Sequence, residues 1–278
     1  MPNYQSIIIG KGKPLIFLPA FGFSGKEGLN IADALSNTYE CHLLDLPGIG
    51  KSEGIKGKVS IHDIAIWLKQ YVDQCRFDAI TLIGHSMGGA VAMCFASIFS
   101  ENVEKLVLLD QGHIIIPRFP TKEFGVFGYL LPIISVLERT IGKPFVKLLH
   151  KFYIHIENNG TKELFQDELK EFCQRFHVEE SDYIREALKE DVVFTQEGLR
   201  LYFGYYRLNL PQLLQQITSP CLLIYASYIN YDPERATKTK EAVKRLVTKN
   251  NVTLLKLDSH HYVHWSGEEC LKNMKKFL

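Results

Sequence analysis

Seven short, almost continuously apolar runs recur along this chain of 278 residues, and helical patterns lie between several of them. The runs are Ser6–Ile9, Pro14–Pro19, Glu40–Asp45, Ala79–Gly84, Lys105–Leu109, Cys221–Tyr225 and Val252–Leu257. Apolar runs without polar alternation are typical of strands that are covered on both faces. Together with helical patterns at Ile61–Cys75, Met87–Phe99 and Glu234–Leu246, they predict an α/β fold with a mostly parallel, doubly wound sheet.

The alternation of strands and helices stops between residues 114 and 216, where no convincing strand run occurs. This stretch has helical patterns at Glu123–Thr140, Pro144–His155, Lys162–Phe176, Ser181–Lys189 and Thr195–Leu208. We therefore expect residues 1–113 and 217–278 to form the core. Residues 114–216 are expected to form a helical cap inserted between two strands of one sheet.

Composition excludes several classes of function. The formal net charge is +1, which gives no electrostatic reason to expect nucleic acid or an anionic membrane as a partner. The six cysteines contain no CxxC pair, so neither a zinc site nor a disulfide framework is indicated. No apolar run reaches about 18 residues, and the first residues lack the apolar centre of a signal peptide. We expect a cytoplasmic protein without integral membrane association.

The strongest chemical signal is AITLIGHSMGGAVA, at Ala79–Ala92. An apolar strand ends at Gly84, the pattern G-x-S-x-G follows, and a helix of small apolar residues comes next. This is the context of a nucleophile elbow, in which Ser86 lies on a strained turn between strand and helix. Glycine at positions 84 and 88 allows the backbone segments to approach closely.

A nucleophilic serine needs a general base, and the chain carries ten histidines. Near the C-terminus the sequence LDSHHYVHWSG follows the last strand pattern, so His260, His261 and His264 are all candidates. The residues alone leave this choice open.

With these motifs the chain resembles capped α/β-hydrolase fold enzymes of the carboxylesterase and lactonase type over nearly its whole length. Members commonly carry Gly-His-x-x-His after the last strand, and the first His is catalytic. The resemblance implies that His261 is the base and that His264 supports the loop. His260 stands where the family has glycine, so it remains an alternative base.

The stretch DLPGIGKSEG contains Gly50-Lys51-Ser52, which looks like the end of a phosphate-binding loop. That loop requires glycine where this chain has Asp45, and Pro47 has no N–H to offer a phosphate. Hydrolases of this family often carry D-x-P-G-x-G-x-S here, and the resemblance implies a structural turn beside the site.

Two further parts of the site follow from the resemblance. Family members usually have His-Gly-x after the early strand, where this chain has Phe21-Gly22-Phe23, so the backbone N–H groups of Phe23 and Met87 are the expected oxyanion donors.

Many members place the acid after the strand that follows the cap, where Asp232 comes three residues late. Haloalkane dehalogenases carry it after the strand before the cap, where Asp110 stands. We favour Asp110 and keep Asp232, also a good N-cap, as the alternative.

Aromatic residues in the cap indicate an apolar substrate. The expected pocket residues are Phe21, His85, Phe124, Phe127 and Tyr205, although most cap aromatics should form the core of the cap. The resemblance implies a serine hydrolase that cleaves a carboxylic ester, lactone or thioester without cofactor or metal. The alternatives are a perhydrolase or C–C hydrolase with the same triad, and a non-catalytic sensor. Nothing in the sequence indicates an oligomeric state.

Overall fold

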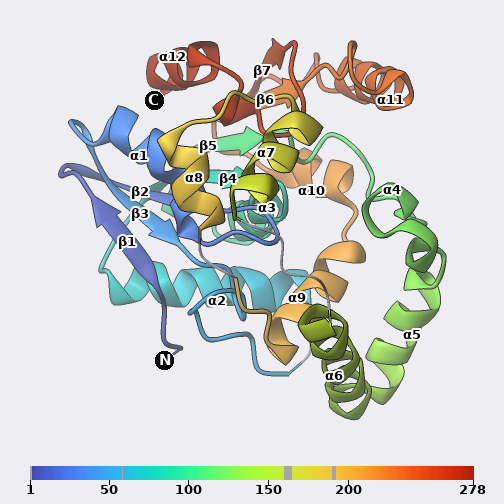
Figure 1. The fold of residues 1–278 in the computed structure, drawn as a ribbon. Helices are drawn as coiled ribbons and strands as arrows, with labels where there is room; N and C mark the ends of the chain where they lie inside the picture. The colour runs from blue at the N-terminus through green and yellow to red at the C-terminus, as the bar shows by residue number, and fades with distance from the viewer. Residues whose placement is uncertain (1, 58, 160–164, 190–191) are drawn as a thin grey trace.

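The computed structural model describes residues 2–57, 59–159, 165–189 and 192–278, and it contains one seven-stranded sheet (Figure 1). The strands are β1 (Ser6–Ile9), β2 (Lys13–Leu18), β3 (Tyr39–Leu44), β4 (Ile80–His85), β5 (Val103–Leu109), β6 (Cys221–Ala226) and β7 (Val252–Leu257). Their order across the sheet is β1-β3-β2-β4-β5-β6-β7, and only β1 pairs antiparallel with its neighbour. The predicted α/β class is confirmed.

Two apolar layers cover the two faces of this sheet. Along β2, Ile16 and Leu18 point into one layer while Leu15 and Phe17 point into the other, because successive side chains of a strand alternate. Helices α2 (Ile61–Gln74) and α3 (Met87–Ile98) cover the first face. Helices α1 (Leu29–Leu35), α11 (Pro233–Lys244) and α12 (Glu268–Phe277) cover the second. Both faces of the central strands are therefore buried, as their continuous apolar runs predict.

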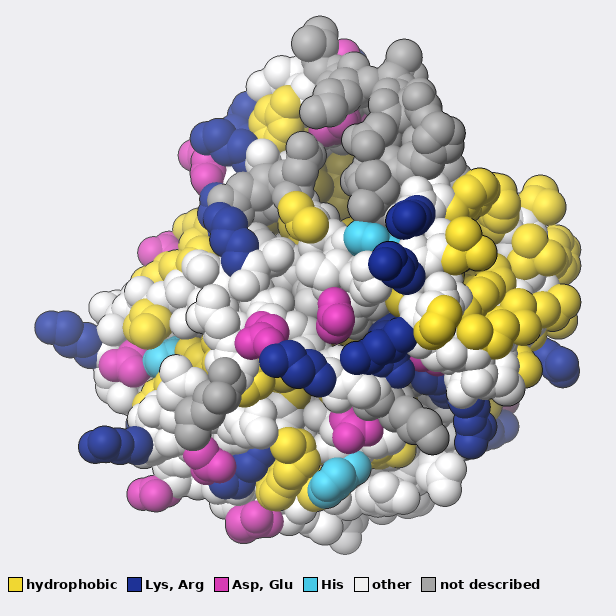
Figure 2. Space-filling model, turned by 90° about the horizontal axis from the view of Figure 1, so that it is seen from below, with side chains coloured by type: hydrophobic (Ala, Val, Ile, Leu, Met, Phe, Trp, Pro, Cys, Tyr) yellow, Lys and Arg dark blue, Asp and Glu magenta, His cyan; other side chains and the backbone are white. Residues whose placement is uncertain are grey.

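The stretch between β5 and β6 is helical, as expected. It contains α4 (Thr121–Phe124), the 3₁₀ turn η3 (Gly125–Tyr129), α5 (Leu131–Ile141), α6 (Lys143–Asn159), α7 (Phe165–Phe176), α8 (Asp182–Leu188), α9 (Gln196–Tyr206) and α10 (Leu210–Gln216). Many hydrophobic side chains of α4 to α6 face outward (Figure 2). Residues 162–164 of the predicted helix Lys162–Phe176 lie outside the described residues.

The single helix predicted at Glu123–Thr140 is wrong. Gly125 has a φ of +54°, which ends α4, and a Cβ at Gly128 would lie 2.8 Å from the backbone of Pro120. Helix α5 then begins anew with Pro132 in its first turn, where proline needs no N–H partner. Two glycines and a proline thus divide the segment into α4, a 3₁₀ turn and α5.

The boundary between core and cap remains a prediction. At its C-terminal end, the packing of α10 bears on where the cap stops. Helix α10 lies within the predicted cap, yet Leu210, Leu213 and Leu214 join the same apolar cluster as α3. Helices α7 and α8 behave differently, because their apolar residues pack on Phe23 and Tyr262 in loops at the edge of the sheet. We find no helix in the described part of the chain with the length and hydropathy needed to cross a bilayer.

Candidate active site

Ser86 lies on the sharp turn between β4 and α3. Its φ of +50° and ψ of −119° are a strained conformation for a residue with a side chain. A Cβ at Gly84 would lie 2.6 Å from the carbonyl oxygen of Gly88, and a Cβ at Gly88 would lie 2.2 Å from that of Leu18. Only glycine fits at both positions, so the G-x-S-x-G pattern has a steric cause in this chain.

Strand register brings Asp110 beside this turn. His85 pairs with Leu109 in the parallel ladder of β4 and β5, so Ser86 and Asp110 are the next residues on two adjacent strands. The Ser86 N–H donates to the Leu109 carbonyl at 3.3 Å, and the Asp110 N–H donates to Ile224 of β6 at 2.7 Å. Both side chains therefore emerge at the carboxyl edge of the sheet, where parallel α/β sheets bind their ligands.

Asp110 is a buried carboxylate surrounded by donors. Its Oδ2 accepts from Nδ1 of His261 at 2.7 Å and from the hydroxyl of Tyr228, and the Arg235 guanidinium lies 3.6 Å away. Its Oδ1 accepts from the Ala226 N–H at 3.0 Å. Burial alone would raise the pKa of Asp110, but the hydrogen bond and charge of His261 outweigh it and hold that pKa well below its usual value. Asp110 is thus ionised at neutral pH.

His261 has one ring nitrogen engaged and one available. Because Asp110 is an acceptor, Nδ1 carries the proton and Nε2 of the neutral ring carries the lone pair. Burial lowers the pKa of His261 to about 4, although the bond to Asp110 opposes this shift. Among the described residues Ser86 Oγ and His261 form no hydrogen bond; in enzymes without substrate this contact is often loose.

The alternative site residues take other roles. Asp232 caps α11 by accepting from the Arg235 N–H at 3.0 Å, and its other oxygen lies 2.7 Å from Lys122 Nζ. His260 accepts from the His261 N–H at 2.8 Å, so its Nδ1 is occupied. Of the two candidate acids and two candidate bases, the structure joins only Asp110 and His261.

A second buried pair, absent from the sequence-based expectations, lies directly behind Ser86. Nδ1 of His85 is 2.5 Å from Glu27 Oε1, and Nε2 of His85 is 3.1 Å from the carbonyl oxygen of His261. The other Glu27 oxygen accepts from the Ala20 N–H at 2.5 Å. The pair therefore ties the loop after β2, the elbow and the histidine loop together. No local pattern marks Glu27, which lies in the short 3₁₀ turn η1 (Gly25–Gly28).

The partners of His85 fix where its protons lie. A carbonyl can only accept, so Nε2 must carry a proton. The contact of Nδ1 with Glu27 is a second hydrogen bond of the same ring. His264 Nε2 lies 3.7 Å from the same Glu27 oxygen, so these three residues resemble a metal-binding set. Metal ligands about 2.1 Å from one ion lie more than about 3 Å apart, so the 2.5 Å contact fits a hydrogen bond instead.

The expected oxyanion donors differ in availability. Met87 is the first residue of α3, where backbone N–H groups have no partner within the helix. The Phe23 N–H instead donates to the Ala20 carbonyl at 3.2 Å, and the Phe23 ring packs against Tyr262 and Trp265. Phe23 could therefore donate to an oxyanion only if this turn loosened, and its role stays a prediction.

The predicted pocket residues fall into two groups. Phe21 and Phe124 both contact the ring of Tyr202, at centroid distances of 5.1 and 5.5 Å, and Tyr205 adjoins it at 6.2 Å. His85 does not line a pocket, because Glu27 and the histidine loop enclose its side chain completely. Phe127 is 62 % exposed, so a place in the pocket wall is not supported.

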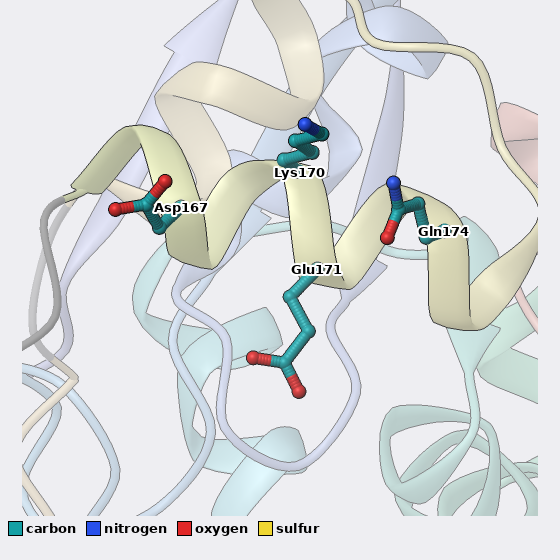
Figure 3. Close-up of a pocket in the computed structure, with 4 residues that line it drawn as sticks. All are labelled: Asp167, Lys170, Glu171 and Gln174. Carbon is teal, nitrogen blue, oxygen red and sulfur yellow. The ribbon is translucent and has the colours of Figure 1, made fainter.

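A separate hollow lies on helix α7 (Figure 3). It is lined by Asp167, Lys170, Glu171 and Gln174, all from this one helix. Figure 3 shows Lys170 and Glu171 pointing in opposite directions, so the polar groups do not converge on one point. This hollow contains none of the site residues expected from the sequence.

The fold, the elbow and the Asp110–His261 pair point to one class of protein, and comparison with known families agrees. The sequence description of the alpha/beta hydrolase fold family matches residues 13–267, and the chain belongs to this family.

Two curated relatives and one solved structure indicate the range of similar proteins. The 2-hydroxy-6-oxononadienedioate/2-hydroxy-6-oxononatrienedioate hydrolase 1 of Pseudomonas putida is 29 % identical over 60 % of this chain and 59 % of its own length. The pimeloyl-[acyl-carrier protein] methyl ester esterase of Shewanella woodyi is 28 % identical over 65 % of this chain and 67 % of its own. The crystal structure of E-2-(acetamidomethylene)succinate hydrolase superposes with a TM-score of 0.67 at 15 % identity, over 100 % of this chain and 99 % of that one.

Proposed function

We propose that this protein is a serine hydrolase that cleaves a carboxylic ester, or a lactone or thioester, of a small and largely apolar substrate. The observation that carries the proposal is the Asp110–His261 bond of 2.7 Å at the same sheet edge as the strained Ser86 turn. The oxygen of Ser86 would attack the carbonyl carbon while Nε2 of His261 takes its proton. His261 would then deliver that proton to the leaving alcohol, and a water molecule would release the acyl group by the reverse sequence.

Aromatic rings between the loop after β2 and the cap support an apolar substrate. Phe21, Tyr202 and Phe124 form a connected run of rings from the loop after β2 to the cap. The polar groups are concentrated at the elbow, where the Met87 N–H opens α3. Such a run of rings, together with one carbonyl-binding point at the elbow, suits a compound that is apolar except at the reacting bond. The esterase relative from Shewanella woodyi acts, by its name, on a methyl ester.

A second candidate is hydrolysis of a carbon–carbon bond beside a ketone, with the same three residues. The Pseudomonas putida relative is named for a 2-hydroxy-6-oxo diacid, a compound without an ester bond. Its hydrolysis must therefore break a bond between carbons. In that reaction His261 would have to return a proton to carbon rather than to oxygen.

The test combines a fluorophosphonate probe, p-nitrophenyl esters of increasing chain length and a 2-hydroxy-6-oxo dienoate. Each is applied to the wild type, to Ser86→Ala and to Ser97→Ala, a matched serine on α3 whose hydroxyl donates to the Cys94 carbonyl. We expect labelling and ester turnover in the wild type and Ser97→Ala, and neither in Ser86→Ala. Turnover of the dienoate alone would favour the second candidate. A folded wild type without labelling or any turnover contradicts both and favours a ligand sensor.

A further inference from the structure

The first half of the cap presents an apolar surface to solvent. Twelve of the nineteen exposed large hydrophobic side chains of the described residues lie between positions 115 and 152. Along η3 and α5 they include Val126, Phe127, Tyr129, Leu130, Ile133 and Val136, which are 47 % to 81 % exposed. Figure 2 shows hydrophobic side chains gathered on this side of the molecule, with Lys and Arg side chains beside them. Contiguous surfaces of this kind mark interaction sites.

The orientation of α5 is set by polar contacts on its inner face. Glu138 is buried and bonds Arg200 at 3.2 Å and Arg207 at 2.8 Å, both from the α9 segment. Arg207 also reaches Ser135, the buried residue one turn earlier. Ile133 and Val136 therefore point outward as a consequence of a buried ion pair. Two polar residues, Ser135 and Glu138, thus lie on the buried side of α5, where a surface helix ordinarily places apolar residues.

Helix α6 adds positive charge to the same side of the cap. Its exposed lysines Lys143, Lys147 and Lys151 follow one another at four-residue spacing, so they form one stripe along the helix. Leu148 and Phe152 lie beside this stripe and are 66 % and 55 % exposed. A hydrogen bond of 2.7 Å from His150 to the Phe194 carbonyl holds the helix in this orientation.

The charge of this surface is one-sided. Between residues 124 and 152 the chain has the three lysines of α6 and Arg139, all exposed, while its one acidic residue, Glu138, is buried. The net charge of +1 for the whole chain conceals this local excess. A second copy docking through the same face would bring like charges together, whereas an anionic surface would be attracted.

We propose that this apolar-basic face, residues 126–152, docks peripherally on an anionic lipid bilayer. Its apolar side chains enter the region between headgroups and acyl chains, and its lysines and Arg139 contact the lipid phosphates. The face lies on the helical segment inserted between β5 and β6, so a bound bilayer would contact this segment. The proposal does not depend on which bond the enzyme cleaves.

The experiment measures binding of the full chain to phosphatidylcholine vesicles with and without phosphatidylglycerol, by co-flotation over a range of salt concentrations. We expect binding only to the anionic vesicles, weakening as salt rises. The triple variant Lys143→Gln, Lys147→Gln, Lys151→Gln should bind about a hundredfold more weakly, since each lysine near an anionic surface contributes several-fold. Its matched control replaces Lys240, Lys244 and Lys275, three exposed lysines of α11 and α12, with Gln and should bind like the wild type.

A second pair of variants tests the apolar contribution. Ile133→Gln with Val136→Gln should weaken binding roughly tenfold, because the buried apolar area decreases. Ile229→Gln with Val247→Gln, at exposed positions outside the face, should not. Equal binding to neutral and anionic vesicles, or equal losses in the controls, would overturn the proposal. A concentration-dependent dimer in sedimentation velocity that Ile133→Gln with Val136→Gln abolishes would also overturn it, because a second copy would then be the occupant.

Discussion

Two imidazole–carboxylate pairs lie side by side at the candidate active site, with His85 and His261 ring centroids 4.7 Å apart, and they differ at the second ring nitrogen. In both pairs Nδ1 contacts a buried carboxylate oxygen, from Glu27 for His85 and from Asp110 for His261. Nε2 of His85 donates to a carbonyl and its side chain has no exposed surface. The His261 side chain is 18 % exposed, and its Nε2 has no hydrogen-bond partner among the described residues. Both histidines contact a carboxylate, so the difference between them lies at Nε2. We therefore assign His261 as the candidate base and His85 as a supporting residue.

The two carboxylates therefore have different roles during turnover. Asp110 must remain charged when His261 gains a proton, because it stabilises the imidazolium that forms. Glu27 contacts His85 and the Ala20 N–H instead of the ring that accepts the Ser86 proton. The same conservative replacement of carboxylate by amide should therefore reduce turnover far more at Asp110 than at Glu27.

The largest effect is expected from Asp110→Asn. An amide cannot balance the charge of protonated His261, and it can favour the wrong tautomer, so kcat should fall by about 10⁴-fold. Steady-state turnover of the best ester from the panel measures it. The matched variant is Glu27→Gln, whose amide can still donate to His85 Nδ1 and accept from Ala20; its kcat should stay within about tenfold of the wild type. Equal losses in the two variants would mean that the pairs act as one charged network.

Removing the Glu27 side chain should lower the stability of the fold as well as the turnover rate. Glu27→Ala leaves the buried Ala20 N–H and His85 Nδ1 without partners, and we expect the free energy of unfolding to fall by about 3 kcal/mol. Urea denaturation followed by circular dichroism measures this change. Glu27→Gln should cost less than about 1 kcal/mol. Stability unchanged in Glu27→Ala would show that the pair does not hold the three loops together.

The pH profile of the wild type should reflect the protonation of His261. Burial lowers its pKa to about 4, and its Nε2 accepts the Ser86 proton only while the ring is neutral. Thus kcat/KM should be flat near neutral pH and fall about tenfold for each pH unit below about 4. In the unfolded chain the pKa of His261 has its ordinary value of 6.5, so the unfolded state binds this proton at a higher pH than the folded state does. The free energy of unfolding should therefore also decrease as the pH falls from 6.5 to 4. An acid limb near 6.5 would mean that His261 is not buried as observed.

A smaller effect is expected from Tyr228→Phe. The Tyr228 hydroxyl donates to Asp110, and losing this donor leaves the carboxylate a stronger base toward His261. We expect the acid limb to move upward from about pH 4, while kcat/KM at neutral pH stays within about tenfold of the wild type. Tyr225→Phe, on the neighbouring strand β6, is the matched control. An unmoved acid limb would indicate that Tyr228 only fills space.

Tyr228 also shows why the sequence predicted part of the site and not the rest. Ser86, Asp110 and His261 each follow a strand pattern, so one sheet edge gathers them once the strand order is known. Tyr228, with a φ of +57°, occupies the loop after β6 where many family members carry the acid, and it points its hydroxyl at the acid after β5 instead. A pattern can reveal that the usual acid is missing, but not which side chain fills its place.

The contacts of Glu27 and the shape of the cap could not be predicted from the sequence either. Glu27 meets His85 across 58 positions, and a lone glutamate in a short 3₁₀ turn carries no periodic signal. In the cap, residues 123–140 have a helical apolar period, but the glycines at 125 and 128 divide the segment into α4, η3 and α5. The exposure of Ile133 and Val136 on α5 is not foreseeable from the sequence either, because an apolar stripe ordinarily points inward and the contacts of Glu138 are long-range.

The smallest effect is expected from Asp232→Asn, which tests whether Asp110 alone supports His261. Asparagine caps helices about as well as aspartate, so α11 should keep its N-terminus. The ion pair with Lys122 is lost, but the Lys122 side chain is 60 % exposed, and such pairs contribute at most about 1 kcal/mol. Turnover should therefore stay within about twofold of the wild type and unfolding should shift by less than about 1 kcal/mol. A loss of several orders of magnitude, with Asp110→Asn nearly as active as the wild type, would assign the acid to Asp232 and leave the Asp110–His261 bond a purely structural contact.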